Sequence, residues 1–450
     1  MTIATPSAKS HERVTGRWDR ELHQSQLSRL KIPRELILYY VKIISGTPIP
    51  WLMCLYALTA FISRAGNELA AWSCAGLTLI YVLADLLSGL REFRIYRIGG
   101  DFFLFGYLLI GAASAASGSS IEENLATFGG LRWVILLYMM AYCWELFPGL
   151  NRIFFLAVAG ASFTAVYGIW QHFSGIDLVR SAELASAPAP GTIFFTPVGF
   201  FNTTEHLGTF LALILPFPVA AYLLDIRRTE RLPRYAALAI ALLLALCILW
   251  TYRPGMWLAG AIGLIIAAIT CARNVFKLLL ASAVFVTTVL LISYSSPESL
   301  WEAVEKTEAT RSEAQRAQIN TQVQIWETSP WIGAGHASIK AANYDPGTGN
   351  VYFQVLAQTG VLGASFYLFF ILGFLLSTYR IFQEIPRSHY WHQVFVAGSL
   401  ASQITFHVAG LYWSTLSEGM AINLFVLIAS GTSYLAHHYN LGIVTDDHAL

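Results

Sequence analysis

One arginine lies where the cost of membrane insertion disfavours a charge. Arg253 sits in LWTYRPGMWLAG, between two apolar runs. A charged side chain at the bilayer centre costs at least about 2.5–3.5 kcal/mol. Pro254 and Gly255 interrupt the helix here, so we expect Arg253 in a turn. Because a guanidinium offers a planar fork of donors to phosphate oxygens, Arg253 is a candidate anion-binding residue. The alternative is an arginine that extends to the lipid headgroups.

Four more side chains in polar segments could take part in the same chemistry. Arg180 is the one cation of its segment, and Arg316 belongs to a later charged segment. Asn202, in FFNTTEHLG, could cap a helix or bind a sugar hydroxyl. His336, in PWIGAGHASIK, suits a general base because imidazole titrates near neutral pH. For each of them, an ordinary surface residue is the alternative.

Other polar and aromatic residues separate binding at one face from transport through the bilayer. Glu205 and His206 open an apolar run, while Trp413 fits an interfacial aromatic belt better than a sugar-stacking platform. Asp85 and His407 are ionisable groups inside apolar runs. A proton-coupled transporter should place such groups near the midplane. The pattern favours chemistry or binding at the outer face.

The elements that position these residues are membrane helices. Apolar residues make up 56% of the 450, charged residues only 12%, and the net charge is +1. Soluble domains carry about 25% charge, so lipid must cover much of this chain. The five cysteines form no CxxC pair or Cys/His cluster, and we expect no metal site and no cofactor. The balanced charge gives no signal for nucleic acid.

The apolar runs predict an all-α, polytopic membrane bundle of about twelve helices. A span needs about 20 mostly apolar residues. The predicted spans are residues 46–63, 69–90, 101–117, 131–147, 152–174, 205–225, 234–251, 255–272, 275–293, 350–377, 391–412 and 417–437.

Loop charges orient these spans. With twelve spans, the arginine-rich loops all fall on one side, which predicts that both termini are cytoplasmic. The one large external loop is rich in Ala, Glu and Gln and predicts helices, with Ile319, Val323 and Trp326 among an apolar stripe toward the bundle. The expected segments are a tail at 1–45, spans one to nine at 46–293, the external loop at 294–349, spans ten to twelve at 350–437, and a tail at 438–450.

Four ordered motifs across roughly residues 195–375 resemble the O-antigen ligase and polymerase superfamily. The segments GFFNTTEHLGTFLALILPFPVA and LWTYRPGMWLAGAIG resemble two family motifs, each a turn that leads into an apolar helix. QRAQINTQVQIWETSPWIGAGHASI and GNVYFQVLAQTGVLGASFYLFF resemble the family's large external loop and the span after it. The order, spacing and sidedness of the four agree with the family.

The resemblance implies a bacterial inner-membrane glycosyltransferase whose working face is periplasmic. Its donor is a glycan on undecaprenyl pyrophosphate, and its acceptor is a sugar hydroxyl of lipid A-core or of another glycan. The reaction uses no metal in most members, and direct displacement by the acceptor would invert the anomeric carbon.

The resemblance also assigns candidate roles to single residues. Arg253 matches the motif arginine and would hold the pyrophosphate, Arg316 is the loop arginine, and Arg180 comes from an unmatched segment. The family commonly has His-Asn where this chain has Gly349-Asn350, so Asn350 is a candidate substrate ligand. The histidine that the family offers as general base is replaced here by Gly349. His336 is the substitute base that the sequence offers.

Three alternatives remain open from the sequence. A polymerase of the same superfamily shares the donor site and cannot be separated from a ligase. A lipid-linked glycan flippase or transporter would need a polar path through the bilayer. A scaffold protein of an envelope assembly line would show no turnover.

Overall fold

The computed structural model describes most of the membrane bundle and part of the large loop. The described residues are 34–88, 96–116, 132–147, 149–180, 182–184, 194–224, 231–271, 313, 315–335, 349–416 and 419–439.

Helices dominate the described residues. They are α2 (Arg34–Gly46), α3 (Ile49–Thr59), α4 (Arg64–Leu87), α5 (Asp101–Ala116), α7 (Arg132–Leu146), α8 (Leu150–Ser174), α9 (Thr204–Ile214), α10 (Pro216–Leu223), α11 (Arg231–Leu249), α12 (Pro254–Cys271), α16 (Val351–Glu384), α17 (Tyr390–Ala409) and α18 (Gly419–His438). Residues 315–328 are helical as well. A short antiparallel hairpin joins β1 (Ile176–Asp177) to β2 (Ala182–Glu183).

Seven helices within the described residues are long and apolar enough to cross a membrane. The expected fold class, an all-α polytopic membrane protein, is therefore confirmed. Helices occupy every expected span that the structure describes, whereas the range 275–293 lies outside the described residues. The count of twelve spans and the segment boundaries remain predictions.

The first apolar span begins earlier than the sequence indicated. It runs over Leu36–Thr59 rather than 46–63. Lys42 lies inside it, and its Nζ pairs with Asp85 Oδ1 of α4 at 2.7 Å. The partner carboxylate compensates the charge, so the apolar run can extend past Lys42.

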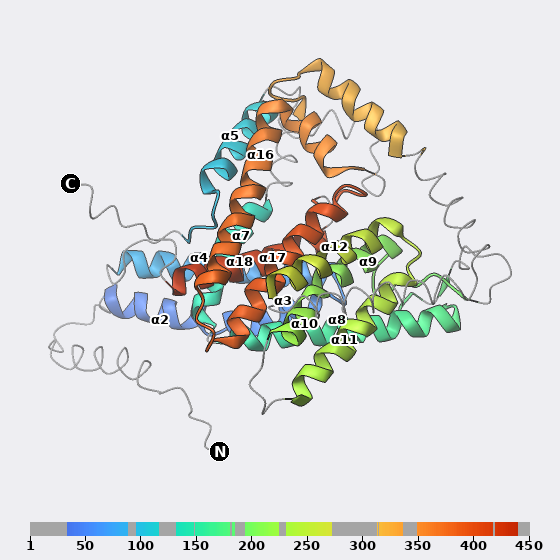
Figure 1. Cartoon of the computed structure of the whole chain (residues 1–450). Coiled ribbons are helices and arrows are strands. Elements are labelled where there is room, and N and C mark those ends of the chain that lie inside the picture. The colour runs from blue at the N-terminus through green and yellow to red at the C-terminus, as the bar shows by residue number, and fades with distance from the viewer. Residues whose placement is uncertain are drawn as a thin grey trace.

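The buried centre of the bundle consists of α9, α10, α17 and α18, with the other helices around it (Figure 1). Outer helices present large apolar side chains outward: Trp51 is 78% exposed and Phe102 is 74% exposed. Polar pairs lie inside instead, such as Asn423 Nδ2 and Asn67 Oδ1 at 2.7 Å. This inverted distribution suits a lipid surround, where interhelical hydrogen bonds join helices.

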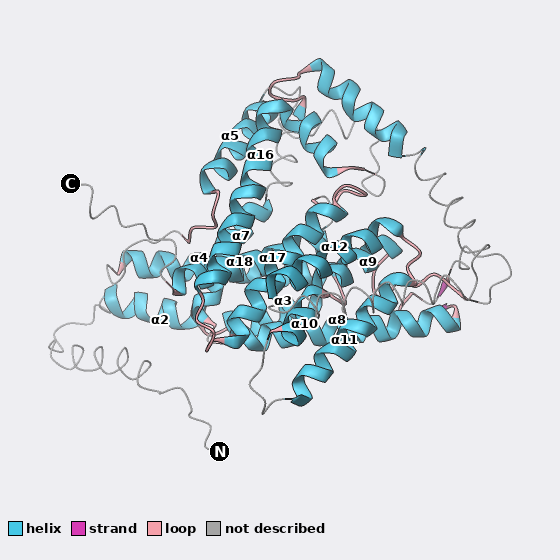
Figure 2. Cartoon of the chain, in the orientation of Figure 1, coloured by secondary structure: helices cyan, strands magenta, loops and turns pink. Residues whose placement is uncertain are grey.

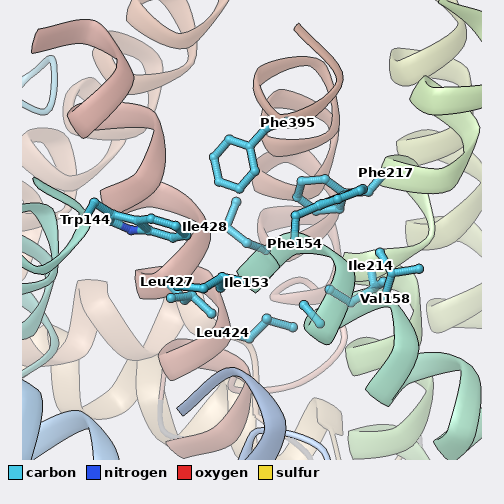
Figure 3. Close-up of a pocket in the computed structure, with 11 residues that line it drawn as sticks. Trp144, Ile153, Phe154, Val158, Ile214, Phe217, Phe395, Leu424, Leu427 and Ile428 are labelled. Carbon is cyan, nitrogen blue, oxygen red and sulfur yellow. The ribbon is translucent and has the colours of Figure 1, made fainter. Parts of the chain in front are cut away.

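A small apolar cavity lies within the core. Figure 3 shows Trp144, Phe154, Phe217 and Phe395 around it, and its volume is about 20 Å³. The indole Nε1 of Trp144 already donates to Ser430 Oγ at 3.0 Å. A sugar, a phosphate or a polyprenyl chain does not fit a water-sized apolar space. This cavity is therefore not the substrate site.

Helix α16 is broken at Gly360, where φ is +63° and ψ is −171°. The break leaves two amides of the second half without helical acceptors. Val361 N donates to Pro330 O at 2.9 Å, and Leu362 N donates to Trp331 O at 3.2 Å. Residues 329–335 thus dock by backbone hydrogen bonds into the break. Beyond it, α16 runs beside α5 (Figure 1).

Candidate functional site

Several helix ends meet at one end of the bundle. There α8 ends, α9 begins, α11 turns into α12, and α17 ends close to the start of α16. Figure 2 shows the loops that join these helices in pink. We call this region the junction and define it by Arg180, Asn202–His206, Arg253, Asn350 and Leu411–Ser414. It gathers four of the six site residues that the sequence singled out.

Arg253 lies in the tight turn between α11 and α12, as expected. The preceding residue, Tyr252, has a φ of +53°, a region that costs a non-glycine residue about 1–2 kcal/mol. The carbonyl of Arg253 then accepts hydrogen bonds from Met256 N at 2.9 Å and Trp257 N at 3.1 Å, which starts α12. A Cβ atom at Gly255 would come within 2.5 Å of the Tyr412 ring. The turn therefore packs closely against Tyr412 at Gly255.

The guanidinium of Arg253 pairs with Glu205. Nη2 lies 3.0 Å from Glu205 Oε1, and the two side chains are only 22% and 16% exposed. Glu205 stands in the first turn of α9, where a carboxylate also interacts favourably with the helix dipole. Thr203 caps that helix by accepting from His206 N at 3.4 Å. An anion that binds Arg253 must therefore share it with a fixed carboxylate.

Arg180 and Asn202 are in contact, and both belong to one local network. Arg180 follows β1 and donates through Nη2 to Phe200 O at 3.0 Å, to Phe201 O, and to Asn202 Oδ1 at 3.3 Å. Its Nη1 pairs with Asp177. Arg180 thus links residues 200–202, which lead into α9 and Glu205, to Asp177. A direct role for Arg180 or Asn202 in substrate binding remains a prediction.

Asp177 has a pKa lowered from its ordinary value of 3.8. Burial raises this pKa, but hydrogen bonds from Tyr167 and Arg180, the charge of Arg180 and the amide of Val179 lower it by more. A depressed folded pKa means that the carboxylate stabilises the fold at neutral pH. That contribution is lost as the pH falls through the lowered value.

We therefore expect Asp177→Asn to lower the unfolding temperature at pH 7. The difference from the wild type should begin to shrink as the pH falls below about 4 and should vanish below the lowered pKa of Asp177, where the wild-type carboxyl is uncharged as well. Thermal unfolding of the detergent-purified proteins between pH 7 and pH 3 measures it. A difference that stayed constant over this range would show that the charge of Asp177 is not what stabilises the segment.

Asn350 acts as the N-cap of α16. Its Oδ1 accepts from Tyr352 N at 2.9 Å and Phe353 N at 3.4 Å, while Nδ2 donates to Leu411 O at 3.0 Å. The side chain is buried, and these three bonds account for an asparagine at this position. Its role as a substrate ligand remains a prediction.

Arg316 lies exposed on helix 315–328. The neighbouring Gln315 donates through Nε2 to Leu411 O at 3.2 Å, the carbonyl that Asn350 also binds. The helix therefore begins beside the junction and ends at the break in α16. The described part of the chain shows no hydrogen bond or ion pair between Arg316 and Arg253.

The buried side chain of helix 315–328 is polar rather than apolar. Ile319, Val323 and Trp326 of the expected apolar stripe are only half-buried, whereas Gln322 is 1% exposed. Neither its Oε1 nor its Nε2 has a hydrogen-bond partner. The sequence correctly predicted a helix here, but its most buried residue is Gln322 and not a member of the apolar stripe.

His336 lies outside the described residues, so its expected place near the junction is untested. The structure does place the glycines before it: Gly333 and Gly335 have φ of +75° and +77°. Ala334 N donates to Ala357 O at 3.0 Å between them. Among the described residues, no group of His, Cys, Asp and Glu is arranged to hold a metal ion.

Trp413 is not the interfacial belt residue that the sequence favoured. It is 1% exposed, and its ring lies 4.8 Å from that of His206, tilted by 39°. Sequence reasoning missed this contact and the Glu205–Arg253 pair, because neither partner is near the other in the chain. The available signal was only that all of these residues were expected on the same face.

The fold and the junction define a polytopic membrane protein with a partly buried arginine at one end of its bundle. The O-antigen ligase family matches residues 238–368, a range that includes Arg253, Arg316 and Asn350. Residues 238–368 thus match the domain of the O-antigen ligase family, and the resemblance seen in the motifs is confirmed. The family supports a ligase or polymerase of the membrane glycosyltransferase type, with a lipid-linked glycan and a glycan acceptor as substrates.

Other comparisons add little. No curated protein matches the chain. Among solved structures, a chain from a peptidoglycan synthase complex that coordinates polymerization and crosslinking matches with 15% identity and a TM-score of 0.41. The match covers 74% of this chain and 97% of that chain.

Proposed function

We propose that this protein transfers a glycan from undecaprenyl pyrophosphate to a sugar hydroxyl of lipid A-core, at the periplasmic face of the bacterial inner membrane. The observation that carries the proposal is Arg253. It is a partly buried cation, fixed in a turn at one end of the bundle, within the range that matches the O-antigen ligase family. Both chain termini are cytoplasmic in this proposal.

The proposed reaction is a direct displacement that inverts the anomeric carbon and uses no metal. The acceptor oxygen attacks that carbon, and the bond to the pyrophosphate oxygen breaks with its electron pair. Arg253 neutralises the charge that develops on the pyrophosphate. Arg180 and Arg316 assist at the phosphates or the glycan, and Asn202 and Asn350 contact sugar hydroxyls. His336 is the sequence candidate that accepts the hydroxyl proton.

The junction favours this reaction over a flippase. Within the described residues, Arg180, Asn202, Arg253 and Asn350 lie at one end of the bundle, and the core cavity is small and apolar. A polymerase of the same superfamily would use the same donor site with another glycan as acceptor.

The glycans on the surface of a deletion strain test the proposal. We expect loss of O-antigen from lipid A-core and accumulation of lipid-linked polymer, because transfer to the core would be the missing step. Electrophoresis of the extracted lipopolysaccharide measures this, with a complemented strain as control. A band with a single repeat would indicate the polymerase instead, and an unchanged pattern would contradict both.

A further inference from the structure

His206 is placed next to the group that holds the proposed phosphate-binding cation. It follows Glu205 in the first turn of α9, and Glu205 pairs with Arg253 at 3.0 Å. The two residues are consecutive in α9, so the Cα atom of His206 lies about 3.8 Å from that of Glu205. His206 is half-buried.

The buried ring of Trp413 packs against the imidazole of His206. The two rings lie 4.8 Å apart, and Trp413 is almost wholly buried. Asn350 and Gln315 both donate to the carbonyl of Leu411, which holds one side of the Trp413 turn. Ser414 donates to Gln354 of α16 on the other side. A catalytic group needs such support, since a displacement of about 1 Å can cost 10²-fold in rate.

Three other described histidines lack this environment. His172 is buried, and its Nδ1 bonds Phe195 O while its ring stacks on Trp250 at 4.5 Å. His407 packs among Phe406, Phe425 and Tyr367 inside the bundle. His389 precedes α17, about 30 Å from that helix's junction end by the rise per residue.

We propose that His206 is the general base of the transfer reaction, an inference that rests on the proposed function. One imidazole nitrogen accepts the proton as the acceptor's O–H bond breaks. The oxygen forms its bond to the anomeric carbon, and the pyrophosphate leaves with the electron pair of the broken bond beside Arg253. The imidazolium then releases the proton to water. Two adjacent residues of α9 thus serve the two ends of the reaction: Glu205 positions the cation, and His206 accepts the proton.

The test compares His206→Gln, His336→Gln and the control His389→Gln in purified full-length protein. Two quantities are measured: kcat for transfer from lipid-linked glycan, and the Kd for that donor in the absence of acceptor. For His206→Gln we expect kcat to fall about 10²-fold. We expect its donor Kd to stay within about twofold and His389→Gln to match the wild type. In His206→Ala, added imidazole should restore part of the turnover.

Each other outcome has a definite meaning. Wild-type turnover in His206→Gln overturns the inference, and loss of turnover in His336→Gln alone assigns the base to His336. Loss of donor binding in His206→Gln, without rescue of His206→Ala by imidazole, shows a structural role and overturns it as well. Absence of transfer by the wild-type protein, with lipid-linked donor and acceptor present, contradicts the proposed function itself.

Discussion

Replacing Arg253 by alanine will lower kcat/KM for glycan transfer by about 10³-fold. The guanidinium is only 22% exposed and is held in a turn, so it meets the leaving pyrophosphate in a poorly screened environment. Its loss removes charge neutralisation in the transition state and weakens donor binding. Initial rates over a range of donor concentrations, with folding checked by thermal unfolding, measure both effects.

Matched variants separate three properties of Arg253: its charge, the planar geometry of its guanidinium, and its pairing with Glu205. Arg253→Lys keeps the charge but loses the fork, so we expect an intermediate rate. Arg253→Ala leaves Glu205 without this cation, and the double variant Arg253→Ala/Glu205→Gln removes that defect. The double variant should recover stability but not activity. If it recovered activity, Arg253 would serve the fold rather than the pyrophosphate.

Arg234→Ala is the control for loss of an arginine. Arg234 lies near the start of α11, donates to Tyr222 O at 3.1 Å, and is separated from the Arg253 turn by the length of that helix. We expect its kcat/KM to stay near the wild-type value. An equal loss in both variants would contradict a specific role for Arg253.

Gly360→Ala will destabilise the protein by about 2 kcal/mol or more, because Gly360 has backbone angles that only glycine adopts readily. A Cβ atom there would also lie 2.3 Å from the carbonyl carbon and oxygen of Trp331. The 329–335 segment would be pushed out of the break in α16. We expect a lower unfolding temperature, faster proteolysis of the external loop and reduced transfer.

Gly76→Ala is the matched control, because Gly76 lies inside α4 and a Cβ atom there meets nothing within 4 Å. Alanine is the better helix former, so this variant should be at least as stable as the wild type. Equal proteolysis of the loop in Gly360→Ala and Gly76→Ala would contradict the docking role of the break.

The sequence predicted the helices well because lipid imposes a simple rule on them. A span needs a long apolar run, and such runs are visible without knowing any contact. The place of Arg253 in a turn followed from Pro254 and Gly255 in the same way. The first span begins earlier than expected because Lys42, the charged residue within it, pairs with Asp85. Hydropathy along the sequence does not reveal a pairing between two distant residues.

Contacts between distant segments could not be predicted from the sequence. The Glu205–Arg253 pair and the His206–Trp413 contact each join residues from different helices or loops. Asn350 is predicted to bind substrate, and its hydrogen bonds to its own helix and to Leu411 give it a structural task as well. The sequence alone does not distinguish a polar residue that caps a helix from one that binds substrate, because the residue type is the same and the contacts differ.

The Glu205–Arg253 pair also sets a threshold for what can occupy the junction. A tethered carboxylate competes at an effective concentration of mM or more, whatever the solution contains. A weakly charged anion at lower concentration cannot displace it. A pyrophosphate that carries more charge, and whose lipid tail concentrates it at the membrane, can. Without donor, Arg253 would therefore stay paired with Glu205 and would not bind free phosphate. It would bind the pyrophosphate only when the lipid-linked donor enters the junction.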